Sequence, residues 1–244
     1  NLKKSFEKFL NKTPGIGKSF ICADDNELKK IVSKINKKNF LTYGFSENAN
    51  FKIFNSIYKK EYSQYDLKIS IPGSKKKIIK KIKLNLIGKH NVLNSVAAIS
   101  LSLHIGIKIK IIKNSLKKFT GIQRRLTKIH HIKGREFFDD YAHHPTEIKS
   151  VLNSLKSTSN HKKIVSVFQP HRYSRLRLLK NDFASAFKDS DLVVLCPVYA
   201  AGEKIDPKYK SKEFAKLISK NSKVQVIMVK DKVSLKNFFI KNLI

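Results

Sequence analysis

Short apolar runs alternate with segments of helical spacing in the first part of the chain. Residues 19–23 and 39–43 are apolar runs typical of strands. They flank residues 24–35, where Leu28, Ile31, Val32 and Ile35 recur at the spacing of one helix face. The pattern predicts a strand–helix–strand unit.

The period then changes twice before residue 120. Residues 51–86 alternate between apolar and polar positions, with a turn at residues 72–74, and this predicts β-structure. Residues 91–105 return to helical spacing, and Gly106 is a typical residue to end that helix. A second helix is expected over residues 108–119.

Strand and helix patterns alternate again after Gly121. We expect strands at residues 128–132, 136–140, 164–168, 192–195 and 224–229, and helices at residues 145–155, 175–187 and 211–219. Such alternation predicts an α/β fold with a mainly parallel sheet covered by helices. We place a domain boundary near residues 121–123, which gives domains of residues 1–122 and 123–244.

The charge of the chain is large but evenly spread. The 244 residues carry a net charge of +33, and 41% of them are hydrophobic, which favours a folded globular protein. Lysines occur in nearly every segment and alternate with Ile and Asn, whereas a nucleic-acid footprint would form a stripe or cluster. We therefore interpret the charge as a solvated coat and expect no specific nucleic-acid partner. A basic nucleic-acid-binding protein is the competing class, and it would require strongly salt-dependent affinity.

The cysteines and the hydropathy of the chain indicate the cellular compartment in which the protein is expected. Cys22 and Cys196 lie far apart and match no metal-ligand spacing, so we interpret them as reduced core residues of a cytosolic protein. The longest apolar stretch, residues 95–107, is too short to span a bilayer, so no membrane insertion is expected. The chain begins at Asn1 and its single methionine is Met228, and we expect it to be a fragment.

Arginine is confined to a few places. Only six of the 51 basic residues are arginines, and five of these six lie in residues 123–126 and 168–177. A guanidinium grips carboxylate or phosphate oxygens with two parallel hydrogen bonds, which an ammonium group cannot do. The distribution predicts a site for anionic ligands.

Residues 15–19 imitate the end of a phosphate-binding loop. The full pattern requires a glycine five residues before Gly17, and Lys12 stands there. The segment also precedes a strand, whereas a phosphate-binding loop precedes a helix. We interpret it as an ordinary turn.

Residues 88–94 open a helix and carry a possible nucleotide site. Asn91 and Asn94 are three residues apart and share one face, with His90 at the helix start. A carboxamide offers a donor and an acceptor side by side, which suits the N6/N7 edge of adenine. Alternatively, one asparagine simply caps the helix. Both interpretations stay open on this segment.

Residues 139–147 run from a strand into a helix. Pro145 suits the first helical position, and Glu147 suits the positive helix end. In an α/β sheet this is the carboxyl edge of a strand, where ligands bind. A metal site is disfavoured, because the consecutive His143 and His144 point in different directions and no close third ligand is evident. Surface histidines in a loop are the remaining alternative.

Residues 168–175 also follow an apolar strand and lead into a helix. Arg172 and Arg175 are one helical turn apart, so their side chains could converge on one anion. The alternative is a helix start with two solvated arginines, and the scarcity of arginine elsewhere weighs against it. The loop of residues 197–203 lies at the same expected sheet edge and has a weaker claim to a role.

Together these segments resemble the Mur ligase family, in order, over most of the chain. The most specific are Asp140-Tyr141-Ala142-His143-His144-Pro145 and Phe168-Gln169-Pro170-His171-Arg172-Tyr173-Ser174-Arg175. Less specific matches occur at residues 42–45, 88–94, 119–125 and 198–203. Ala142 stands where the family commonly has glycine.

The resemblance implies a fold and an activity. Residues 1–122 would be the C-terminal part of a central ATP-binding domain, and residues 123–244 a Rossmann-like C-terminal domain with a mainly parallel sheet. The implied reaction joins L-alanine to the carboxylate of UDP-N-acetylmuramate, for peptidoglycan precursors in the bacterial cytoplasm. ATP phosphorylates the carboxylate, the amine attacks the acyl phosphate, and phosphate leaves. Mg2+ would assist, with its ligands upstream of Asn1.

The resemblance also implies residue roles. His90, Asn91 and Asn94 would hold adenine, and Arg125 and Asp140 would hold ATP. The sites for L-alanine and the muramate carboxylate would be lined by Tyr141, His143, His171, Arg172 and Arg175. Arg172, Arg175 and His143 are the expected catalytic residues.

The resemblance is incomplete at both ends. In the family a UDP-binding domain and a phosphate-binding loop precede the position of Asn1, and a final strand follows that of Ile244. We therefore expect residues 1–244 to be inactive alone. Two alternatives stay open, a related ligase that recycles tripeptide and a non-catalytic nucleotide-binding module.

Overall fold

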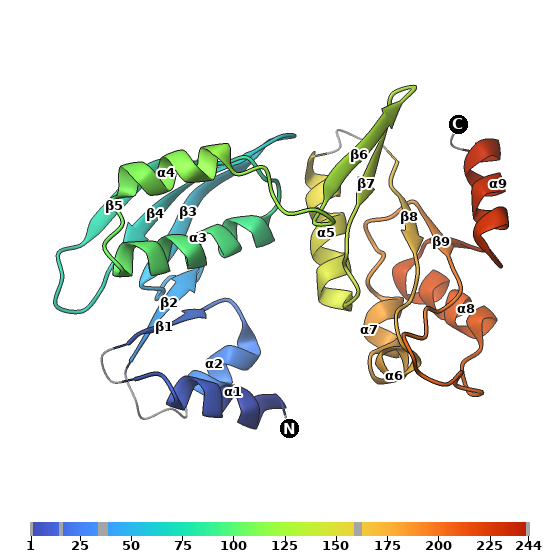
Figure 1. Ribbon diagram of the computed structural model, residues 1–244, viewed down its shortest axis with the longest axis horizontal. Coiled ribbons are helices and arrows are strands. Elements are labelled where there is room, and N and C mark those ends of the chain that lie inside the picture. Colours follow the sequence, from blue (N-terminus) through green and yellow to red (C-terminus); the bar gives the residue numbers. More distant parts are fainter. Residues whose placement is uncertain (1, 15–16, 34–38, 159–162, 243–244) are drawn as a thin grey trace. The chain divides into compact units, whose positions relative to one another are not determined.

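The computed structural model describes residues 2–14, 17–33, 39–158 and 163–242. The chain divides into two compact units, Asn1–Thr120 and Gly121–Ile244 (Figure 1). Within the described residues, no helix combines the length and apolar character needed to cross a membrane.

The first unit opens with the predicted strand–helix–strand arrangement. The chain begins with α1 (Leu2–Asn11). The strands β1 (Ser19–Cys22) and β2 (Phe40–Gly44) then pair with each other in parallel, and α2 (Asn26–Val32) lies between them in the sequence. The Asp25 carboxylate caps α2 by accepting hydrogen bonds from the backbone N–H groups of Glu27 and Leu28. The helix is shorter than predicted, and residues 34–38 lie outside the described part. Gly15 and Ile16 of the turn before β1 also lie outside it.

The alternating segment forms three antiparallel strands. These are β3 (Phe51–Tyr58), β4 (Ser63–Ile69) and β5 (Lys77–Leu84), and they complete a sheet of order β1-β2-β3-β4-β5. The helices α3 (Lys89–His104) and α4 (Ile109–Lys118) lie on one face of this sheet (Figure 1). Alternate residues such as Tyr65 and Leu67 are fully buried against Val96 and Ile99 of α3. The predicted β-rich segment and the two helices are confirmed.

The second unit contains a parallel sheet of order β10-β9-β8. Its strands are β8 (Val165–Phe168), β9 (Leu192–Leu195) and β10 (Gln225–Met228). The strands β6 (Thr127–Ile132) and β7 (Arg135–Asp139) instead form a separate antiparallel pair. Lys133 and Gly134 both have positive φ, at 47° and 76°, which suits a two-residue hairpin turn. The predicted α/β class is confirmed, but these two strands are not part of the parallel sheet.

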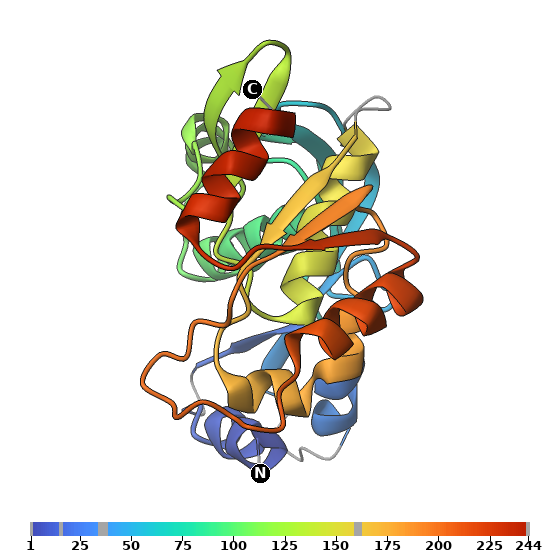
Figure 2. The same cartoon turned by 90° about the vertical axis from the view of Figure 1, so that its right-hand side faces the viewer.

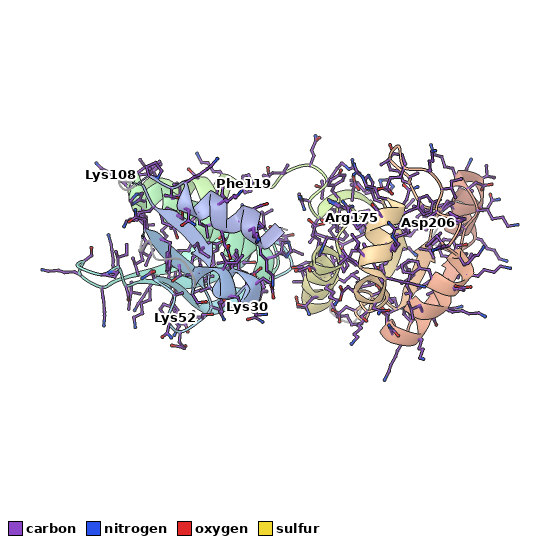
Figure 3. All side chains as sticks on the ribbon, turned by 90° about the horizontal axis from the view of Figure 1, so that it is seen from below. Lys30, Lys52, Lys108, Phe119, Arg175 and Asp206 are labelled. Atoms are coloured by element: carbon purple, nitrogen blue, oxygen red, sulfur yellow. The ribbon has the colours of Figure 1, made fainter. Side chains whose placement is uncertain are left out.

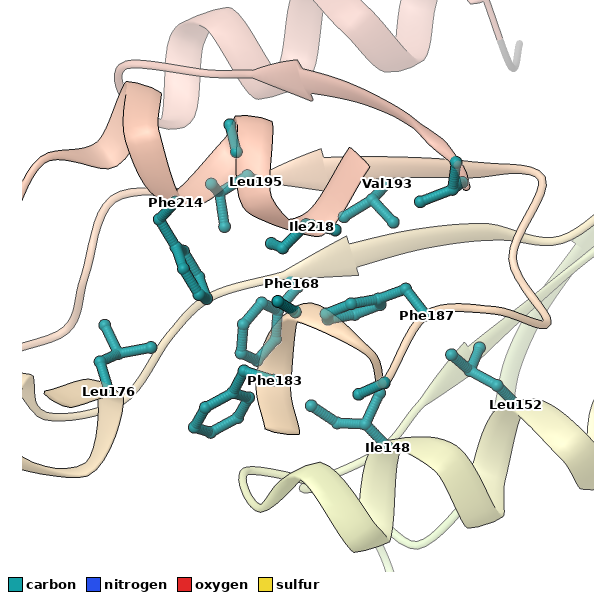
Figure 4. Close-up of a cluster of buried hydrophobic side chains, with 14 residues drawn as sticks. Ile148, Leu152, Phe168, Leu176, Phe183, Phe187, Val193, Leu195, Phe214 and Ile218 are labelled. Carbon is teal, nitrogen blue, oxygen red and sulfur yellow. The ribbon is translucent and has the colours of Figure 1, made fainter. Parts of the chain in front are cut away.

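Alternation along β9 places helices on both faces of the parallel sheet. Val193 and Leu195 face a cluster formed with α5 (Pro145–Thr158), α7 (Lys180–Ala184) and α8 (Ser211–Ser222) (Figure 4). Val194 faces the other side and packs in a cluster with Phe238 of α9 (Lys232–Asn242). Figure 2 shows α9 as the red helix next to the C-terminus. This three-layer arrangement fixes the carboxyl ends of β8 and β9 as neighbours.

The prediction of one continuous helix over residues 175–187 is wrong. This segment forms two short helices, α6 (Tyr173–Leu178) and α7, which meet at Leu179 with φ −120°. The break lets Leu176 of α6 and Phe183 of α7 both enter the core, while Leu178 is 80% exposed. Packing against the sheet overrides the continuous helical pattern of the sequence.

Side chains project outward on all sides of each unit (Figure 3). Many of them are lysines, and Lys30 and Lys108, which the figure labels, are both exposed. This spread is the arrangement expected of a solvated coat.

Candidate functional site

The loops that follow β8 and β9 are joined by backbone hydrogen bonds. The N–H of Arg172 donates to the carbonyl of Tyr199 at 2.9 Å, and the N–H of Tyr199 donates to the carbonyl of Pro170 at 2.8 Å. His171 and Tyr199 thereby form an isolated parallel bridge. The two loops continue the pairing of their strands beyond the sheet, at the edge where α/β folds bind ligands.

Arg172 occupies an unusual backbone conformation. It precedes α6 with φ 69° and ψ 131°, and its side chain does not cap the helix. Positive φ costs an L-residue about 1–3 kcal/mol, and such strain concentrates at functional sites. Surrounding contacts, such as the hydrogen bond to Tyr199, therefore set the backbone of Arg172, whose side chain is exposed.

Arg175 lies one turn later and connects to another loop. Its Nη1 donates to the carbonyl of His143 over 3.4 Å and lies 3.5 Å from Nδ1 of His171. The guanidinium is half-buried. It thus links the loop after β8 to the loop that contains His143.

Asp140 fixes the shape of that loop. One carboxylate oxygen accepts the N–H of Leu126 at 2.7 Å, and the other accepts the N–H of Ala142 at 2.7 Å. The N–H of Tyr141 donates to the carbonyl of Arg124 at 2.7 Å. The loop follows the hairpin strand β7, so the prediction that it leaves a strand of the parallel sheet is wrong. Its contact with Arg175 nevertheless brings it to that sheet's edge.

The start of α5 holds the backbone of both histidines. Pro145 begins the helix, as predicted, and the Glu147 carboxylate accepts the N–H groups of His143 and His144 at 3.0 and 3.1 Å. The other oxygen of Glu147 lies 3.6 Å from Nη1 of Arg125. Burial by itself raises the pKa of Glu147, but the hydrogen bond from His143 and nearby positive charge outweigh it, and the net pKa is lowered. Glu147 is therefore ionised at neutral pH.

Four rings from three loops form a continuous row. Ring centroids are separated by 4.9 Å for Tyr141–His143, 6.1 Å for His143–His171 and 5.3 Å for His171–Tyr199. Burial lowers the pKa of His171, and the adjacent cations of Arg175 and Arg172 lower it further. His171 is consequently neutral at pH 7, and Arg172 and Arg175 place fixed positive charge beside it.

A cluster of this composition can bind and stabilise carboxylate oxygens. Guanidinium groups donate charge-assisted hydrogen bonds, and a neutral imidazole can accept a proton. No three His, Cys, Asp or Glu side chains within the described ranges lie close enough to hold a metal ion.

The possible adenine residues lie in the first unit, at the start of α3. Gly88, with φ 95°, occupies the cap position, and no side chain caps the helix. The alternative that an asparagine caps α3 is therefore wrong. The Asn91 amide donates to the carbonyl of Ile87 at 2.8 Å, which orients its carboxamide, while His90 is half-buried and Asn94 exposed.

Two residues of the site were missed at the level of the sequence. Ser174 and Glu203 hydrogen-bond to each other through the Ser174 N–H, at 3.0 Å, and through its hydroxyl. An acidic residue at the end of a strand-end loop was the available signal. Its partner lies 29 residues earlier, and spacing alone does not identify such a pair.

Comparison with known proteins gives the class. The family description "Mur ligase middle domain" matches residues 1–102, and "Mur ligase, glutamate ligase domain" matches residues 124–239. The chain belongs to the Mur ligase family.

Curated relatives of the chain carry the name of one particular ligase within this family. The UDP-N-acetylmuramate–L-alanine ligase of Pelagibacter ubique is 52% identical over 244 residues, which are 100% of this chain and 52% of the relative. The ligase of the same name from Brachyspira hyodysenteriae is 43% identical over 202 residues, or 83% of this chain and 43% of the relative. The chain thus spans about half the length of these relatives.

Solved structures share the fold. The UDP-N-acetylmuramate–alanine ligase of Thermotoga maritima superposes with a TM-score of 0.71 at 24% identity, over 96% of this chain and 47% of that protein. A murein peptide ligase of Psychrobacter arcticus gives 0.67 at 17% identity, over 99% and 49%.

Proposed function

We propose that the chain is part of an ATP-dependent ligase that adds L-alanine to the carboxylate of UDP-N-acetylmuramate. The observation that carries the proposal is the Arg172–Arg175 pair beside His143 and His171, in a chain 52% identical to a relative of that name. The family resemblance also supports a bacterial cytoplasmic location and a role in peptidoglycan precursor synthesis.

Arg172 and Arg175 are assigned to the acyl group. Their guanidinium forks hold the muramate carboxylate while ATP phosphorylates it. They then stabilise the oxyanion that forms when the amine attacks the acyl phosphate and that collapses as phosphate leaves. The positive φ of Arg172 sets the direction in which its side chain leaves the backbone.

His143 is assigned to the amine. Its Nδ1 lies 2.8 Å from the carbonyl of Tyr141, so Nδ1 carries the proton and Nε2 is left as the acceptor. L-Alanine must lose a proton before its nitrogen can attack, and Nε2 of His143 is the group that accepts it. Tyr141 and neutral His171 line the same site.

The nucleotide contacts are proposed separately for each unit. His90, Asn91 and Asn94 hold the adenine edge in the first unit, and Arg125 and Asp140 contact ATP in the second. Arg125 would exchange its 3.6 Å contact with Glu147 for phosphate oxygens. Mg2+, which the family resemblance implies, has no candidate ligand set within the described residues, so no step is assigned to it.

The test is a chimera that joins this chain to the part of the Pelagibacter ubique relative that it does not match. Phosphate release should require ATP, UDP-N-acetylmuramate and L-alanine together. Replacing L-alanine by a tripeptide amine should abolish it. If the folded chimera releases phosphate only with the tripeptide, the chain belongs to a recycling ligase. If it binds ATP but releases no phosphate with either amine, it is a nucleotide-binding module.

A further inference from the structure

We infer that Glu203 is a positioning residue, which fixes the start of α6 and through it the guanidinium groups of Arg172 and Arg175. The effect of Glu203 on catalysis rests on the proposed function. The contacts of Glu203 that support the inference all lie within the second unit.

Glu203 takes the place of a helix cap. The first N–H groups of a helix have no partner within the helix, and a cap residue normally accepts one of them. Arg172 stands at the cap position of α6 and supplies no acceptor. The Glu203 carboxylate arrives from the loop after β9 and accepts both the N–H and the hydroxyl of Ser174.

Two tethers therefore hold the chain on either side of Tyr173. The N–H of Arg172 is bound to the Tyr199 carbonyl, and the N–H of Ser174 is bound to Glu203. Both tethers come from the same loop, residues 197–203. Together they offset the strain of positive φ at Arg172, which otherwise favours a different backbone. Because α6 begins here, a change at residues 172–174 would also move Arg175.

The charge of Glu203 supports this role. The Ser174 hydroxyl, followed by the Ser174 N–H, lowers the pKa of Glu203, so the group is ionised at neutral pH. Arg172 contributes to the same lowering. Burial, the cations of Arg175 and Arg172, and His143 lower the pKa of His171, and Glu203 partly opposes them. Both Glu203 oxygens accept hydrogen bonds from Ser174.

The kinetic test uses the chimera with three substitutions. Glu203→Ala should raise the KM for UDP-N-acetylmuramate about 10- to 100-fold, as expected when one charge-assisted contact to a carboxylate is lost. Glu203→Gln keeps an acceptor for Ser174 and should recover part of the loss. Glu213→Gln, at an exposed position of α8, is the matched control and should match the parent.

A fourth variant tests the route through Ser174. Ser174→Ala combined with Glu203→Ala should be no worse than Glu203→Ala alone, because both act on the same contact. Full additivity would mean that Glu203 acts directly on substrate, and the inference would be overturned. An unchanged KM and kcat in Glu203→Ala, in a chimera whose parent ligates L-alanine, would also overturn it.

A structural readout keeps the inference separate from the proposed function. In residues 1–244 labelled with 15N, the Ser174 amide proton should resonate downfield and titrate at a pH below the ordinary value for glutamate. Glu203→Ala should abolish both features while the dispersion of the rest of the spectrum stays intact. If the Ser174 amide is unaffected, the inference is wrong whatever the chimera does. If the parent chimera fails to ligate L-alanine, the proposed function fails, and this amide still decides the structural role.

Discussion

At positions 172 and 175 the chain uses guanidinium groups, although it uses lysine almost everywhere else. Arg175 is half-buried and reaches both the carbonyl of His143 and the ring of His171. A lysine at this position would supply the charge but could not present two parallel donors to one carboxylate. The chemistry of these two positions thus depends on the geometry of the side chain more than on its charge.

The first prediction concerns these two side chains. In the chimera, Arg172→Lys or Arg175→Lys should lower ligation by about one to two orders of magnitude, since one charge-assisted hydrogen bond is worth roughly 1.5–3 kcal/mol. Steady-state phosphate release measures the effect. The urea midpoint should hardly change, because neither side chain is fully buried.

Two lysine-to-arginine changes serve as controls. Lys76→Arg and Lys117→Arg alter exposed positions of the first unit and should leave ligation at the parent rate. Parent-like rates in both Arg172→Lys and Arg175→Lys would show that the forks are not needed, and the arginine argument would fail.

Among the elements, the connection from β2 to β3 depends on one carboxylate. Asp24, which follows β1, accepts the N–H groups of Phe45 and Ser46 at 2.8 and 2.9 Å and the Ser46 hydroxyl at 2.7 Å. Gly44 lies beside it with φ 148°, and a Cβ there would be 2.7–2.9 Å from the carboxylate atoms. The carboxylate therefore requires glycine at the end of β2.

Gly44→Ala should destabilise the first unit by about 1–3 kcal/mol from backbone strain, plus the displacement of Asp24. Gly73→Ala is the matched control, because Gly73 also has positive φ, 77°, but open space around its Cβ position. Urea unfolding of both variants measures the difference. Equal losses would show that the contact with Asp24 does not matter.

Asp24 also predicts a dependence on pH. Burial raises its pKa, but hydrogen bonds from Phe45 and Ser46 outweigh it and the net pKa falls below the ordinary 3.8. A depressed folded pKa contributes stability above the unfolded value, and that contribution is lost as pH falls through the folded value. Asp24→Asn should therefore cost more stability at pH 7 than at pH 3. Urea unfolding of parent and variant at both values tests this, and a constant difference would contradict it.

For the whole molecule, the net charge of +33 is distributed over both units and not gathered at one site. Charge of this kind binds polyanions without selectivity and releases counterions when it does so. Affinity for duplex DNA should therefore vanish between low salt and physiological salt and should show no sequence preference. Fluorescence anisotropy with two unrelated duplexes measures this. Saturable binding to one duplex at physiological salt would favour a nucleic-acid-binding protein instead.

The sequence determined the element types, the α/β class and the loops in which the candidate residues lie. Periodicity records which residues of one segment face the core, and this is local information. It placed β9, α3 and α5 close to their observed positions, and arginine scarcity singled out Arg172 and Arg175.

The contacts between these segments follow from the three-dimensional fold. It paired β6 with β7 in a hairpin, broke the helix at Leu179, and left the cap of α3 to Gly88. It also placed Glu203 on Ser174 and held Arg172 at positive φ. The reason is that the break at Leu179, the Glu203–Ser174 contact and the backbone of Arg172 depend on packing and hydrogen bonding between residues distant in sequence, and no local pattern encodes the identity of such a partner.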